Sequence, residues 1–162
     1  MSGKKVKNIH GWWGINGKES KYFLPVLVLV ILFSSVLLAQ QVISFKIVVN
    51  KNNPVTKMTR DEVSDIFLKK SPKWPDGEKM MPIDLVSTNP LREIFSQRVH
   101  QKSVSAIKIY WQKKIYAGTG LPPAERKNDT EVLVYIRNHS GAIGYVSAKA
   151  DLDSVKEVQI TE

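Results

Sequence analysis

Two short stretches of this 162-residue chain decide its fold. The first reads Asp65-Ile66-Phe67-Leu68 and continues, after a short gap, into Lys73-Trp74-Pro75-Asp76-Gly77. The second lies about seventy residues later and reads Ser140-Gly141-Ala142-Ile143-Gly144-Tyr145-Val146. The Pro and Asp-Gly positions predict a loop with a turn, and Trp74 is expected to anchor that loop on the domain. In the second stretch, Gly141 is expected to end a helix, and 142–146 to form a short strand.

Strand and helix patterns alternate along the rest of the chain. Short apolar runs bounded by turn residues predict further strands at 45–50, 81–86 and 155–160. Apolar residues three and four positions apart predict helices between them, with caps at Thr59, Asn89, Ser103 and either Asp129 or Thr130. Thr59 and Glu62 also match a capping box. The alternation predicts one α/β domain with a largely parallel sheet.

In this order and spacing, the two motifs resemble one lobe of the type II periplasmic solute-binding proteins. They are most similar to the phosphate-binding components of ABC transporters, where IF-x-G-x-x-x-W opens the second lobe and G-(S/A)-I-G-Y-V closes it. The resemblance covers roughly Ile47 to Val158. It implies a mostly parallel sheet flanked by helices and preceded by an N-terminal apolar helix. A two-lobed clamshell needs about twice the ~120 residues beyond that helix, so this chain is expected to supply one jaw.

The N-terminus has the pattern of an export segment. Five lysines precede an uncharged run from Tyr22 to Val42, which places the basic flank in the cytoplasm. A signal peptide cut after Ala39 is slightly favoured, although Leu37 stands where a small residue is preferred. A retained anchor stays open because ~20 apolar residues can span a bilayer. The leader also fits a start codon placed too early. We therefore expect a leader with signal peptide or anchor at 1–39 and a periplasmic-binding-like domain at 40–162, in the periplasm or anchored to the inner membrane.

Composition argues against several classes of function. Removing residues 1–39 takes away five Lys and one Glu and leaves 19 basic and 14 acidic residues, a net charge of +5. This is below the concentrated charge of a nucleic-acid binder. The absence of cysteine excludes disulfides and thiolate metal sites. His10, His100 and His139 lack metal-ligand spacing, and no nucleophile motif or paired carboxylates stand out, so neither an enzyme nor a cofactor is predicted.

The candidate ligand site lies between the second strand and the helix that follows it. The resemblance implies that this helix start holds an oxyanion, and the matching residues are Ser87, Thr88, Asn89 and Arg92. Free N–H groups and the helix dipole at such a start favour negative charge. The segment lacks the family's Ser-Gly-Thr core, and Pro90 removes one donor. A well-capped helix with a solvated Arg92 is an equal alternative.

The sequence thus predicts an exported phosphate- or oxyanion-type solute-binding-like protein, accessory to ABC-type uptake or sensing. The partners implied are phosphate or another small oxyanion, an inner-membrane transporter or sensor, and the membrane itself through residues 22–42; nucleic acid is not among them. The alternative is a non-transporting periplasmic interaction module that docks on a membrane sensor or transporter. The basic cluster Lys69, Lys70 and Lys73 is expected to be a solvated face, or else to meet an acidic partner or anionic headgroups.

Overall fold

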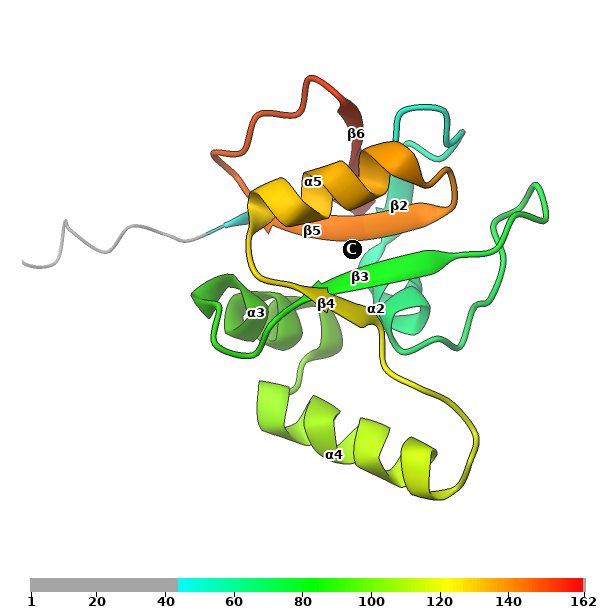
Figure 1. The fold of residues 1–162 in the computed structure, drawn as a ribbon, viewed down its shortest axis with the longest axis vertical. Helices are drawn as coiled ribbons and strands as arrows, with labels where there is room; N and C mark the ends of the chain where they lie inside the picture. The colour runs from blue at the N-terminus through cyan, green and yellow to red at the C-terminus, as the bar shows by residue number, and fades with distance from the viewer. Residues whose placement is uncertain (1–43, 162) are drawn as a thin grey trace, which may run out of the picture. The chain divides into compact units, whose positions relative to one another are not determined.

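The computed structural model describes residues 44–161 (Figure 1). The predicted leader, the apolar run and the boundary at residue 39 lie outside the described residues and stay predictions. Between residues 44 and 161, no helix is both long and apolar enough to cross a membrane.

The four predicted strands and the four predicted helices are all present, together with two strands that the sequence did not reveal. The elements follow in the order β1 (Phe45–Asn50), β2 (Lys57–Thr59), α2 (Arg60–Phe67), β3 (Met81–Leu85), α3 (Pro90–Phe95), a π-helical turn (Ser96–His100), α4 (Val104–Tyr116), β4 (Ala124–Arg126), α5 (Asp129–Asn138), β5 (Ala142–Ser147) and β6 (Val155–Thr161). The additional strands, β2 and β4, have three residues each. Such short segments show no measurable alternation, which is why the sequence pattern missed them.

The strands form one six-stranded sheet in the order β2-β6-β1-β5-β3-β4. β2 is parallel to β6, and β3 is parallel to both β4 and β5. β1 is antiparallel to both of its neighbours, β5 and β6. The α/β class is confirmed, and the predicted parallel pairing holds for three of the five strand pairs. The sheet is therefore mixed, with its antiparallel part around β1.

Helices cover both faces of the sheet, and two consecutive residues of β5 show how. A Cβ at Gly144 would meet Val132 Cγ1 at 2.9 Å and Ile136 Cδ1 at 3.0 Å, so α5 packs directly on this face. Tyr145 points to the other face, because successive side chains of a strand alternate. Its ring stacks on Phe95 of α3 with centroids 3.8 Å apart and lies 5.8 Å from Phe67 of α2. α5 therefore covers one face, and α2 and α3 cover the other.

The two sequence motifs meet at the start of β3. Trp74 is 2% exposed, and its Nε1 donates a hydrogen bond of 3.0 Å to the carbonyl of Gly141. The same carbonyl accepts from the N–H of Met81 at 2.9 Å. A Cβ at Gly141 would lie 2.1 Å from the carbonyl oxygen of Lys79, so only glycine fits there. The prediction that Trp74 anchors its loop is confirmed.

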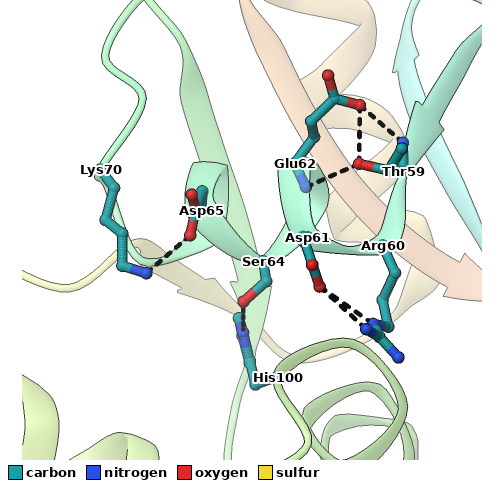
Figure 2. Close-up of polar contacts among 8 residues, drawn as sticks. All are labelled: Thr59, Arg60, Asp61, Glu62, Ser64, Asp65, Lys70 and His100. Carbon is teal, nitrogen blue, oxygen red and sulfur yellow. Dashed lines mark hydrogen bonds and ion pairs between the residues drawn. The ribbon is translucent and has the colours of Figure 1, made fainter. Parts of the chain in front are cut away.

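Local capping follows the sequence except at the two ends of α5. Thr59 and Glu62 form the predicted capping box at the start of α2 (Figure 2), Asn89 caps α3, and Ser103 caps α4. The prediction of Asp129 or Thr130 as the cap of α5 is wrong, because Asn128 accepts from the N–H of Glu131 at 3.0 Å. The helix also ends at Asn138, before Gly141, whose small size serves the close approach to Lys79 instead.

α4 packs apart from the main core of the lobe. It lies at the end of the lobe opposite β6 (Figure 1). Ile107 and Trp111 form a small separate cluster with Leu68, while the main core lies around the sheet. Tyr110 adds a hydrogen bond from its hydroxyl to the carbonyl of Leu68 at 3.1 Å.

Candidate functional site

The four residues predicted to form the site separate into two groups. Ser87 and Thr88 are exposed in the turn after β3. The side chain of Asn89 already makes hydrogen bonds within the domain. Its Oδ1 accepts from the N–H of Leu91 at 3.0 Å, and its Nδ2 donates to the carbonyl of Lys127 at 3.1 Å. Arg92 lies in the interior with 5% of its surface exposed. The alternative of a solvated Arg92 is therefore wrong.

Asp84, on β3, is the charge partner of Arg92. Its carboxylate forms an ion pair with Nη1 of the guanidinium, and the two side chains are 5% and 6% exposed. Nη1 contacts the carboxylate without the alignment of a hydrogen bond, and Nε has no hydrogen-bond partner among the described residues. Buried guanidinium N–H groups are costly when unpaired. Asp84 therefore neutralises the charge of Arg92, while the guanidinium still has N–H groups that can donate hydrogen bonds.

Tyr145 completes a buried polar group with Asp84 and Arg92. Its hydroxyl donates to Oδ1 of Asp84 at 2.6 Å, and the N–H of Leu85 donates to the same oxygen at 2.9 Å. Burial raises the pKa of Asp84 to about 6, because the effect of lost hydration exceeds the opposing effects of Arg92 and Tyr145. Burial and the neighbouring Asp84 carboxylate raise the pKa of Tyr145. The group thus holds a carboxyl that titrates close to neutral pH.

A cleft opens beside this group, between α4 and the carboxyl ends of β3 and β4. Its volume is about 360 Å³. The polar part of its lining consists of Asp84, Ser87, Arg92, Lys108, Gln112 and Glu125. The apolar part consists of Val104, Ile107, Trp111, Ile115, Pro122 and Pro123. The cleft therefore includes two of the four predicted residues, Ser87 and Arg92, but neither Thr88 nor Asn89.

Sequence reasoning missed Asp84 and the α4 wall of the cleft. A signal for Asp84 was present, because it is the one charged residue in the apolar strand Met81–Leu85. Buried charges of this kind are rare unless they are paired, and they cluster at functional sites. The α4 wall gave no such signal, since an apolar stripe on a helix normally indicates core packing.

His100 is the last residue of the π-helical turn that follows α3. It is 7% exposed, and its Nδ1 lies 2.9 Å from Oγ of Ser64 on α2 (Figure 2). Burial, together with the positive charges of Arg92, Lys70 and Lys102, lowers the pKa of its imidazole to about 4. At neutral pH His100 is therefore an uncharged part of the interior.

The basic cluster near α2 is exposed, and two of its lysines have local partners. Lys70 forms a 2.7 Å ion pair with Asp65 (Figure 2). Nζ of Lys69 donates to the carbonyl of Pro122 at 3.0 Å, which ties the loop after α4 to the lobe. In residues 44–161, no three His, Asp or Glu side chains lie close enough together to hold a metal ion.

Comparisons with known proteins agree with this architecture. No curated protein matches the chain. Among solved structures, it is similar to a putative phosphate ABC transporter substrate-binding protein with bound phosphate from Clostridium perfringens, with 19% identity and a TM-score of 0.59 over 73% of this chain and 45% of that one. An ABC-type phosphate transport receptor from Vibrio cholerae gives 19% and 0.59 over 73% and 46%. A possible phosphate binding protein from Planctomyces limnophilus gives 17% and 0.57 over 74% and 42%.

These similarities show the fold of this chain, and their coverage shows how much of each solved structure the chain matches. The chain spans less than half the length of each of these three proteins. A family model described as the PBP superfamily domain matches residues 42–160, which is most of the chain. The single-lobe fold expected from the two motifs is thereby confirmed, and the chain belongs to the PBP superfamily.

Proposed function

We propose that this protein is an exported oxyanion-binding lobe that acts as an accessory to ABC-type uptake or sensing. The observation that carries the proposal is the cleft beside α4, which is lined by Arg92, a buried guanidinium whose Nε has no hydrogen-bond partner among the described residues. A guanidinium edge in this position suits one oxygen of a phosphate-like ion. The phosphate transport proteins of similar fold support the choice of ligand class.

Other groups that line the cleft can also interact with an oxyanion. The hydroxyl of Ser87 can donate to a second oxygen, and Lys108 of α4 brings a cation to the same opening. Asp84 opposes them, because its carboxylate already neutralises Arg92. One lobe also leaves the ligand in contact with water, where charge pairs are weak. We therefore expect affinity in the millimolar range, roughly −4 kcal/mol, with tighter capture requiring a second lobe or partner.

The pH dependence of binding follows from the titration of Asp84. The pKa of this carboxyl lies at about 6, so protonation below pH 6 removes the negative charge that competes with the ligand. Anion affinity should therefore rise as the pH falls from 8 to 5. Sulfate is the suitable probe, because it stays divalent over this range whereas phosphate gains a proton.

The proposal is tested by NMR titration of the folded protein with sulfate and phosphate. We expect amide shifts at Ser87 and Arg92 and in the facing part of α4. Asp84→Asn should bind sulfate more tightly at pH 8 and lose the pH dependence, because Arg92 is then free of its counter-charge. Asp84→Asn combined with Arg92→Gln should abolish binding while keeping the interior uncharged.

Arg98→Gln provides the matched control. Arg98 is exposed in the π-helical turn and does not line the cleft, so its removal changes the net charge without touching the site. It should leave the shifts at residues 87–92 in place. Absence of any shift there at tens of millimolar anion, in a folded protein, would contradict the oxyanion site.

A docking module is the second candidate function, and the observation that favours it is the exposed apolar surface of α4. Ile109 and Tyr116 are 53% and 91% exposed on this helix. A solute-binding cleft does not require these side chains, because neither of them lines it.

A further inference from the structure

The segment between Glu93 and Glu125 is unlike the rest of the chain in its charge. Its 31 residues contain no Asp or Glu and carry five basic side chains, namely Arg98, Lys102, Lys108, Lys113 and Lys114. It comprises the last two residues of α3, the π-helical turn, α4 and the loop to β4. Positive charge is therefore concentrated on the end of the lobe that α4 forms (Figure 1).

The same end exposes apolar side chains that the fold does not use. On α4, Ile109, Lys113 and Tyr116 lie four and three positions apart and therefore share one stripe of the helix. Ile107 and Trp111, which pack against Leu68, lie on the other side of the helix. Just beyond the helix, Leu121 is 68% exposed. We name the three residues Ile109, Lys113 and Tyr116 the α4 outer surface.

We propose that the α4 outer surface docks on the surface of an anionic phospholipid bilayer. A helix with lysines and exposed apolar side chains rests in the headgroup region, where the apolar atoms leave water and the ammonium groups meet phosphates. Tyrosine is favoured at this depth because its ring is apolar and its hydroxyl is polar. The surface consists of few side chains, fewer than a stable protein–protein interface needs, so it suits a planar lipid surface better than the protein partner of a docking module.

A retained anchor would hold this lobe close to a membrane. The uncharged run ends at Val42 and β1 begins at Phe45, so a retained anchor would leave only a few residues between bilayer and domain. Docking of α4 would then fix the orientation of the lobe on its membrane. The inference goes beyond the proposed oxyanion function and does not depend on it, since the α4 outer surface and the cleft have no residue in common.

The experiment uses the absence of cysteine from the chain. The full chain carries one cysteine, introduced as Tyr116→Cys and labelled with a polarity-sensitive dye. Gln159→Cys, exposed on β6 and outside the basic segment, is the matched control site. Each protein is combined with vesicles of phosphatidylcholine alone or with vesicles that also contain phosphatidylglycerol.

We expect a blue shift of the dye at residue 116 with anionic vesicles, little shift with neutral ones, and none at residue 159. Reversing two exposed charges outside the cleft, Lys102→Glu with Lys113→Glu, should abolish the shift. Lys51→Glu with Lys57→Glu changes net charge equally at exposed positions outside the basic segment and should preserve it.

Several results would overturn the inference. They are no shift at residue 116 with either lipid, equal shifts with neutral and anionic vesicles, and equal shifts at residues 116 and 159. A shift that depends on protein concentration in the absence of vesicles would assign the α4 outer surface to contact between two copies of the chain. Sulfate binding in the cleft is measured on the same variants, so failure of docking is distinguishable from failure of the proposed function.

Discussion

The region around Trp74 and the region around α4 belong to the same lobe but are stabilised in different ways. Near Trp74, the side chain is buried and its polar atom is paired with Gly141. Near α4, a three-residue cluster provides the packing, while Ile109 and Tyr116 face solvent. Beside α4, Arg92 also keeps a buried donor that has no hydrogen-bond partner within residues 44–161. Departures from good packing and pairing tend to mark functional sites, so the second region is the place where we propose the function, while the first stabilises the fold.

The largest expected effect tests that division with two tryptophans. Trp74→Ala should destabilise the domain by ~3 to 5 kcal/mol, because it removes a buried ring and leaves the carbonyl of Gly141 with one donor fewer. Trp111→Ala should cost about 2 kcal/mol, because its cluster is small and α4 can adjust. Urea unfolding followed by circular dichroism measures both. Equal losses would show that α4 is as integral to the fold as the motif region.

A second prediction concerns two buried ionisable residues, His100 and Asp84. The pKa of His100 is about 4 in the folded protein, against about 6.5 in an unfolded chain. The unfolded state therefore binds more protons between these values, so His100 lowers stability as the pH falls from 6.5 to 4. Asp84 acts in the opposite direction, because its pKa of about 6 exceeds the ordinary value of 3.8, and it adds stability as the pH falls through 6.

These two contributions largely cancel in the natural protein between pH 4 and 6. His100→Gln should remove one of them, so that the variant gains roughly 3 kcal/mol relative to the natural protein when the pH falls from 7 to 4. The difference in unfolding free energy between the two proteins, measured at several pH values, isolates this effect from the other carboxylates. A constant difference would mean that His100 titrates normally and is hydrated.

Sequence patterns predicted the first region far better than the second, and the reason is physical. Around Trp74, the turn residues, the glycines and the apolar runs are local signals that agree with the global fold. The burial of Arg92 depends on Asp84, which approaches it only when α3 packs near β3. No local pattern encodes that approach. Likewise, the antiparallel placement of β1 results from the chain's path across the sheet, and alternation of elements alone suggested parallel neighbours.

The smallest expected effect lies on the α4 outer surface. Tyr116 is 91% exposed, so Tyr116→Ser should change the unfolding free energy by less than ~0.5 kcal/mol. Tyr110→Phe, on the same helix, is the matched tyrosine. It loses the hydrogen bond to Leu68 and should cost about 1 kcal/mol. If Tyr116→Ser destabilised the domain as much as Tyr110→Phe, the exposed ring would contribute to packing, and the α4 outer surface would no longer be free to dock. If the change is negligible, the fold itself gives no reason for an apolar ring at this position, and the reason must be sought in what the surface contacts.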